Sequence, residues 1–184
     1  MHILIYNILY INMKIAIAGQ ICSGKSTLAN YLIEKYPFLI KKSFAGKVKE
    51  IATDLFDMKE KDRNLLQSIG TSMRSINPDV WVNYIIKCDE KHIIIDDLRY
   101  ENEARILKDN NWYIIRLNIT DKLQKSRIIK TYPDTFQDHL NNLRHESELE
   151  ISILDKYIDL ELESNNIDYN KLNYFINDIY IKKI

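Results

Sequence analysis

The feature that constrains this chain most is a short glycine-rich segment near its N-terminus. It consists of Gly19, Gln20, Ile21, Cys22, Ser23, Gly24, Lys25, Ser26 and Thr27. The two glycines lie five positions apart, lysine and serine follow at once, and the segment separates an apolar run at 14–18 from an amphipathic helical pattern. A strand, a glycine loop and a helix in this order can surround a phosphate chain with backbone N–H groups. The segment therefore predicts a phosphate-binding loop.

The side chains of this loop suit the phosphates of ATP. Lys25 would place a mobile positive charge over the terminal phosphates, and Ser26 would offer its hydroxyl to Mg²⁺. We expect Cys22 to be a tolerated loop residue rather than a redox switch. The residues expected to contact the ATP phosphates are Gly19, Cys22, Ser23, Gly24, Lys25, Ser26 and Thr27.

Hydrophobic periodicity predicts strands that alternate with helices. Strands are expected at 14–18, 93–95, 112–117 and 157–162, and helices after residue 25, within 48–56 and 63–76, from residue 78, at 100–110, along a polar stretch to 145, directly after it, and at the C-terminus. This alternation predicts an α/β chain with a three-layer P-loop NTPase fold around a parallel sheet.

Composition sets bounds on the number of domains and on the partners. A chain of 184 residues suits one domain, and 26 basic against 26 acidic side chains give no overall field for nucleic acid or membrane. Two cysteines and four scattered histidines favour a reduced cytoplasmic protein, in the host cytoplasm if the source is viral. The apolar residues 1–12 are too short to cross a bilayer and lack a cleavage site, so we expect an extension or an added edge strand.

Two acidic residues follow the apolar run at 93–95. Asp96 and Asp97 end this buried strand, and we expect Asp97 to hold Mg²⁺ through water. Capping of the next helix is an alternative role for Asp97. Switch-type GTPases read guanine with an Asn-Lys-x-Asp motif. The Asn-Lys pair at 170–171 does not complete this motif, because no aspartate follows at the required position. A switch-type GTPase is therefore disfavoured.

A helical insert of roughly fifty residues, at about 44–90, separates the phosphate loop from this acidic strand and exceeds what a minimal crossover needs. Within it, Arg63, Gln67, Gly70 and Arg74 follow at intervals of four, three and four, so they share one face of a helix. Two guanidinium groups, an amide and a glycine could bind a phosphate and a polar ring. A merely solvated face is the alternative.

These motifs together resemble the deoxynucleoside monophosphate kinases of bacteriophages and large DNA viruses. Five ordered blocks carry the resemblance: the glycine loop; Ser43-Phe44-Ala45 with Lys47 and Lys49; Leu66-Gln67 and Gly70-Thr71 with Arg74 leading to Trp81; Asp97-Leu98-Arg99-Tyr100-Glu101-Asn102-Glu103; and His145 with Ser147-Glu148. The resemblance implies transfer of the terminal phosphoryl group of ATP to a deoxynucleoside monophosphate (dNMP), within a parallel-sheet core that carries a substrate-binding arm and a lid.

The resemblance also implies roles for individual residues. The dNMP site would comprise Phe44, Lys47, Arg63, Gln67, Gly70, Arg74, Trp81, Arg99 and Glu103. The lid, at about 120–148, would contribute Arg127, Lys130, Arg144 and His145, with Arg127 as the first candidate for a catalytic cation beside Lys25 and Asp97. Such an arginine can contribute roughly 10³ to 10⁵ in rate. Family resemblance alone suggests a homodimer, and the base preference is left open.

Two other functions stay open. A phosphomevalonate kinase of the P-loop type shares the loop, the aspartate-x-arginine turn and a serine-glutamate lid motif. A non-catalytic ATP-binding regulator is the alternative from a different class, although the intact Lys25, Ser26 and Asp97 count against it.

Overall fold

The fold centres on a parallel sheet, seen in a computed structural model that describes residues 12–141, 143 and 150–181. Five strands lie in the order β2-β3-β1-β4-β5. Their bounds are β1 Met13–Gly19, β2 Ile40–Lys42, β3 His92–Leu98, β4 Tyr113–Asn118 and β5 Leu160–Glu163. β1 lies at the centre and its residues are buried in clusters on both faces of the sheet, so its near-continuous apolar run is typical of a buried parallel strand.

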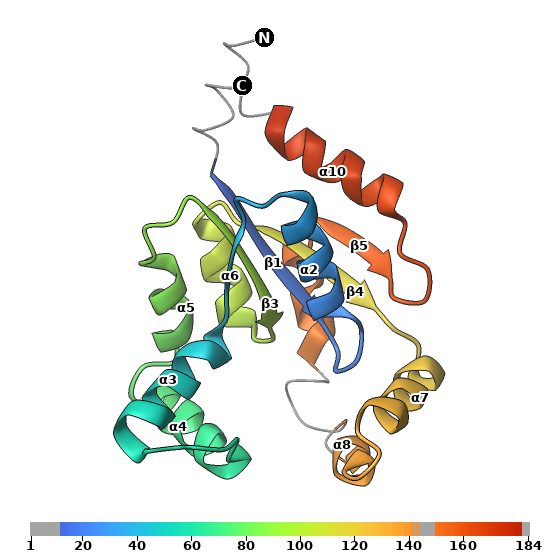
Figure 1. The fold of residues 1–184 in the computed structure, drawn as a ribbon. Helices are drawn as coiled ribbons and strands as arrows, with labels where there is room; N and C mark the ends of the chain where they lie inside the picture. Colours follow the sequence, from blue (N-terminus) through green and yellow to red (C-terminus); the bar gives the residue numbers. More distant parts are fainter. Residues whose placement is uncertain (1–11, 142, 144–149, 182–184) are drawn as a thin grey trace.

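One face of the sheet is covered by the helix that follows the phosphate loop and by the C-terminal helix (Figure 1). These are α2, Lys25–Lys35, and α10, Tyr169–Ile181. Leu28 and Leu32 of α2 and Ile176 of α10 are buried in one cluster with Ile15 and Ile17 of β1. This packing fixes the start of α2 against the end of β1.

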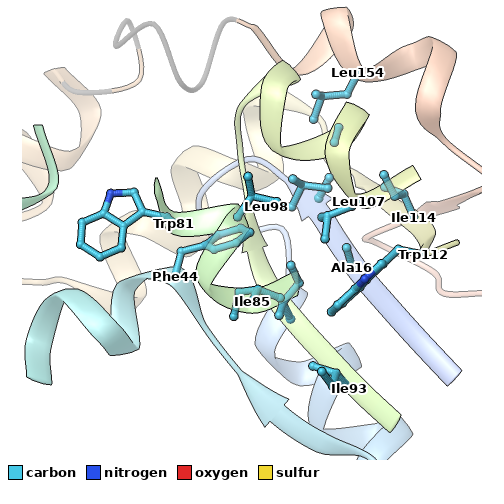
Figure 2. Close-up of a cluster of buried hydrophobic side chains, with 14 of the residues drawn as sticks. Ala16, Phe44, Trp81, Ile85, Ile93, Leu98, Leu107, Trp112, Ile114 and Leu154 are labelled. Atoms are coloured by element: carbon cyan, nitrogen blue, oxygen red, sulfur yellow. The ribbon is translucent and has the colours of Figure 1, made fainter. Parts of the chain in front are cut away.

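The opposite face carries the helices of the insert and the helix after β3. They are α3 Phe44–Phe56, α4 Arg63–Ile76, α5 Val80–Ile86 and α6 Glu101–Asp109, with the 3-10 helix η2 Glu150–Tyr157 beside α6. Figure 2 shows how Phe44 and Trp81 extend this core away from the sheet, while Trp112 lies close to Ala16 of β1. The core on this side therefore reaches from the sheet into the insert.

Two groups of helices flank the end of the sheet to which the strands point (Figure 1). The insert helices α3 and α4 lie on one side, and α7, Asp121–Thr131, with α8, Phe136–Asn141, lies on the other. The carboxyl ends of parallel strands are where ligands bind in α/β folds. The arrangement directs attention to the space between these two groups.

The structure differs from the sequence prediction in two places. Strand β2 was not predicted, because it has only three residues and is mostly exposed, which leaves little hydrophobic pattern. Residues 150–157 form a 3-10 helix rather than an α-helix, so Tyr157 ends that helix and does not begin a strand. The predictions for residues 1–11, Arg144 and His145 fall outside the described residues. Within the described part of the chain, no helix is long and apolar enough to span a membrane.

Candidate active site

The glycine loop has a backbone that its two glycines make accessible. Gly24 takes a φ of 95° as the N-cap of α2, and Gly19 takes a φ of 149°, both in the region that favours glycine. A Cβ atom at Gly19 would lie 2.7 Å from Ser23 Oγ and 2.8 Å from the Leu117 carbonyl oxygen. Cys22 also takes a positive φ of 61°. The loop is thus tightly wound against the end of β4.

The hydroxyl groups of Ser26 and Thr27 lie exposed in the first turn of α2, which contains no acidic residue. Lys25 folds back over the loop, and its Nζ donates to the carbonyl oxygens of Gly19 at 2.6 Å and Gln20 at 2.8 Å. The positive end of the helix, the lysine and the hydroxyl groups therefore meet at one place, which is the arrangement that binds phosphate.

Arg127, predicted as a lid cation, lies against this loop. Its Nη1 donates to the Cys22 carbonyl oxygen at 3.1 Å and to Ser164 Oγ at 2.6 Å, and its Nη2 donates to the Ser164 carbonyl oxygen at 3.0 Å. The same Nη1 would lie 3.9 Å from a Cβ atom at Gly24. Lys130, the other described lid cation, is exposed further along α7.

A cavity of about 510 Å³ opens beside the loop, between the insert helices and the end of β3. Its lining consists of Ile21, Phe44, Ala45, Val48, Lys49, Leu66, Gln67, Gly70, Thr71, Arg74, Trp81, Asp97, Arg99, Tyr100, Glu103 and His139. Aromatic and aliphatic side chains share this surface with two guanidinium groups. The cavity therefore has both an apolar wall and a cationic one.

Most residues predicted for the acceptor site come together in this lining: Phe44, Gln67, Gly70, Arg74, Trp81, Arg99 and Glu103. Two of the predicted residues lie outside it. Lys47 forms an ion pair with Glu50 at 2.8 Å, and Lys49 lines the cavity instead. Arg63 reaches His139 of α8, with 3.1 Å between Nη2 and Nε2. The helical spacing identified the face of α4 but not how far along the helix the cavity extends.

Gly70 brings the backbone of α4 close to two important side chains. Its carbonyl oxygen accepts from Trp81 Nε1 at 3.4 Å, and a Cβ atom at this position would lie 3.6 Å from Arg74 Nη1. Arg74 in turn stacks over the ring of Tyr100, with 4.6 Å from its guanidinium carbon to the ring centroid. Trp81 and Arg74 of the cavity lining both therefore lie close to this glycine.

The aspartates at the end of β3 face opposite sides of the sheet. Ala16 of β1 pairs with Ile95 and Ala18 pairs with Leu98, so β3 contains an extra residue between these two pairs. Asp96 forms an ion pair at 2.7 Å with Lys41, which aligns with Ile94 of the core that contains α2. Asp97 lines the cavity on the other face.

Asp97 has one engaged oxygen atom and one unengaged one. Its Oδ2 accepts from Ser43 Oγ at 3.0 Å and from the Ala45 backbone N–H at 2.9 Å, at the start of α3. Its Oδ1 is buried and has no hydrogen-bond partner among the described residues. Burial raises the pKa of this carboxyl group, although hydrogen bonds from Ala45, Ser43 and Phe44 act in the opposite direction. Asp97 therefore lines the cavity and retains one carboxylate oxygen atom without a hydrogen-bond partner among the described residues.

Glu103 supports the loop between β3 and α6 from inside. Its Oε2 accepts from the backbone N–H groups of Arg99 and Tyr100, each at 3.2 Å, and its Oε1 lies 3.6 Å from Arg74 Nη2. The side chain is 3% exposed, and burial raises its pKa to about 7. Asn102 ties the same loop to α5 through Asp79 Oδ1, at 2.7 Å. Glu103 thus contacts the guanidinium group of Arg74 and holds the backbone of Arg99.

Sequence reasoning missed His139, Lys49 and Tyr100 as cavity residues. His139 stacks on Tyr132, with ring centroids 3.9 Å apart, and lies on the α8 side of the cavity. Its partner Arg63 is 76 positions away in the chain, so no local spacing could signal the contact. Lys49 and Tyr100 stood inside recognised motifs and could have been included on that ground.

Known proteins share parts of this sequence and its fold. The family model described as AAA domain matches residues 15–136. A protein of Acanthamoeba polyphaga mimivirus, whose name carries a provisional assignment as a deoxynucleotide monophosphate kinase, is 25% identical over 141 residues, which cover 56% of this chain and 72% of that protein.

Solved structures of other kinases share the fold. The shikimate kinase of Aquifex aeolicus superposes with a TM-score of 0.59 at 14% identity, over 91% of this chain and 96% of that one. A gluconokinase of Sinorhizobium meliloti gives a TM-score of 0.52 at 13% identity, over 93% and 97% of the two chains. The chain belongs to the family described as AAA domain and is a P-loop kinase similar to the viral deoxynucleotide monophosphate kinases.

Proposed function

We propose that this chain transfers the terminal phosphoryl group of ATP to a deoxynucleoside monophosphate, and so produces ADP and a deoxynucleoside diphosphate. The observation that carries the proposal is the cavity beside the phosphate loop, which combines Phe44 and Trp81 with Arg74 and Arg99. An acceptor with a planar base and a phosphate group matches both of these surfaces. The volume of about 510 Å³ lies within the usual range for a small-molecule site.

The two arginines suit the phosphate of the acceptor. A guanidinium group can bind phosphate oxygens in pairs, and Glu103 together with Tyr100 restricts where Arg74 can lie. Gln67 lies on the same helix face and could donate or accept hydrogen bonds at the base edge. The name of the mimivirus relative supports the same class of acceptor.

Mg²⁺ would accompany ATP at this site. The residues suited to it are Ser26, whose hydroxyl is exposed in the first turn of α2, and Asp97, whose buried Oδ1 has no partner among the described residues. Both are oxygen donors, which Mg²⁺ prefers directly or through water. The ion would supply neutralisation of the charge on the β- and γ-phosphates.

The residues of the chain would position the reactants and balance charge. Lys25 would leave the carbonyl oxygens of its own loop for the terminal phosphates, and Arg74 and Arg99 would hold the acceptor phosphate in line with the γ-phosphorus. The segment at about 44–90 would act as the substrate-binding arm. The segment at about 120–148 would close as a lid and bring Lys130, Arg144 and His145 toward the reaction, whereas Arg127 already lies against the phosphate loop.

ADP production with ATP, Mg²⁺ and a panel of acceptors tests the proposal. The panel contains the four dNMPs, the corresponding ribonucleotides and mevalonate 5-phosphate, with Lys25→Ala as the blank. Stimulation by one or more dNMPs, with formation of the diphosphate, is the expected result. Turnover with mevalonate 5-phosphate alone would point to the metabolite kinase, and ATP binding without any acceptor-dependent turnover would point to a regulator.

A further inference from the structure

The backbone carbonyl groups of the phosphate loop are held from outside by side chains. The five successive carbonyl oxygens of residues 19–23 each accept a hydrogen bond from a side chain. Lys25 Nζ donates to the carbonyl oxygens of Gly19 and Gln20. The next three are covered by Gln124 Nε2 on Ile21 at 3.1 Å, Arg127 Nη1 on Cys22 at 3.1 Å and Ser164 Oγ on Ser23 at 2.5 Å.

A held carbonyl group fixes the direction of the next N–H group. The peptide unit is planar and trans, so its C=O and N–H bonds point in opposite directions. Anchoring the carbonyl oxygens of Ile21 and Ser23 therefore orients the N–H groups of Cys22 and Gly24 toward the opposite side of the loop. The Ser23 N–H donates within the loop to the Gln20 carbonyl oxygen at 3.2 Å. Aligned N–H groups of this kind form the anion-binding concavity of a phosphate loop.

The anchoring groups are buried, and the loop conformation needs support. Gln124 is 2% exposed and Ser164 is 6% exposed, and both are polar side chains whose burial is compensated by these contacts. Cys22 holds a φ of 61°, a conformation that persists in a non-glycine residue where the surroundings enforce it. Arg127 donates its hydrogen bond to the carbonyl oxygen of Cys22 itself.

We propose that Gln124, Arg127 and Ser164 are positioning residues that hold the phosphate loop ready for the phosphates of ATP before ATP arrives. Gln124 and Arg127 lie on α7, and Ser164 directly follows β5, so the loop is set by elements more than a hundred residues away in the chain. The inference depends on ATP use by a P-loop kinase. It does not depend on which acceptor the proposed function assigns.

The test measures phosphate binding in the absence of an acceptor. Gln124→Met keeps the volume of the side chain and removes the donor, and Ser164→Ala removes the hydroxyl. We expect each to raise the Kd for ATP and for tripolyphosphate several-fold, and the double variant to raise both roughly tenfold or more, because each removes one hydrogen bond from the loop. The KM of the acceptor should change less than the KM of ATP.

A matched control is Ser75→Ala, whose hydroxyl donates to the Ser72 carbonyl oxygen in an exposed turn of α4 outside the cavity lining. It should leave both Kd values unchanged. Arg127→Lys keeps the charge but cannot make the three contacts of the guanidinium group, so it should also weaken tripolyphosphate binding. The positioning role is excluded if Ser164→Ala and Gln124→Met have the same unfolding temperature as the parent and their Kd values for ATP and tripolyphosphate stay within twofold of the parent values.

Discussion

At the residue scale, Gly19 and Gly46 offer a matched pair of glycines with opposite expectations. Gly19→Ala should lower the free energy of unfolding by about 2 kcal/mol or more and abolish ATP binding, because a Cβ atom there meets Ser23 and the Leu117 backbone at a positive φ. In Gly46→Ala, the nearest atom to the new Cβ is Ser43 Oγ at 3.5 Å, an ordinary contact within α3. The free energy of unfolding of that variant should rise by about 0.5–1 kcal/mol. Urea unfolding and ATP titration measure both effects.

Glu103 makes stability depend on pH in a direction opposite to most carboxyl groups. Burial raises its pKa from 4.5 to about 7 in the folded chain, so the folded state binds more protons than the unfolded state between these values. The parent therefore loses stability as pH rises through this window, by up to about 3 kcal/mol. Glu103→Gln keeps an oxygen acceptor for Arg99 and Tyr100 without titrating. The unfolding free energy of this variant minus that of the parent should rise from pH 5 to pH 8. A difference that does not change with pH would contradict the raised pKa of Glu103.

The neighbouring aspartates separate a metal role from a structural one. Asp97→Asn should raise the Mg²⁺ concentration needed for half-maximal rate roughly 10–100-fold, since Asp97 lines the cavity and its Oδ1 has no partner among the described residues. Asp96→Asn removes the ion pair with Lys41 and should mainly lower stability. Rates measured across a Mg²⁺ titration distinguish the two. A larger shift in the Asp96 variant would move the metal role to the face of the sheet that carries α2.

At the element scale, α4 and α8 are joined by the contact between Arg63 and His139, and His139 lines the cavity. Arginine cannot accept a hydrogen bond, so the imidazole accepts in its neutral form. Burial, then Arg63 and Lys61, lowers the pKa of His139, while Asp138 raises it. Because the folded pKa is depressed, the contact is fully present above the ordinary pKa of 6.5 and is lost as pH falls through the folded value.

This contact predicts a pH dependence of acceptor binding. The KM of the acceptor should rise several-fold as pH falls from 7.5 to 5.5, while the KM of ATP changes less, because protonated His139 repels Arg63. His139→Gln retains an acceptor oxygen without a proton-binding nitrogen and should flatten the profile. An unchanged profile in this variant would assign the acid effect to another group, such as the acceptor phosphate.

Some of these elements could be predicted from the sequence and others could not. Strands β1 and β3 each contain a short continuous apolar run, at 15–18 and 93–95, because both faces of the sheet are covered, and the phosphate loop is a local motif. The face of α4 followed from helical periodicity. In contrast, β2 is short and exposed, and the Arg63–His139 contact joins separate helices. Alternation along β3 places Asp97 on the face of Ile93 and Ile95, whereas the extra residue of β3 becomes visible only in the pairing register.

At the scale of the whole molecule, α3 and α4 lie on one side of the carboxyl end of the sheet and α7 and α8 on the other (Figure 1), and residues of α3, α4 and α8 line the cavity. Closure of these two parts around both substrates would exclude water from the γ-phosphate. ADP release without an acceptor should therefore be slow, and a saturating dNMP should accelerate it roughly tenfold or more. A coupled ADP assay with and without the acceptor measures this ratio. A ratio near one would mean that water reaches the phosphate freely.

The two outer strands of the sheet carry charge along their length. In β2, Lys41 and Lys42 form ion pairs with Asp96 and Glu90, and in β5 two glutamates alternate with buried leucines. Outer strands with unpaired backbone groups can recruit strands from other molecules, and short, charged strands resist this. Crowded copies of this chain should therefore not join sheet to sheet into filaments. Any assembly that they form would be expected to use helical surfaces instead.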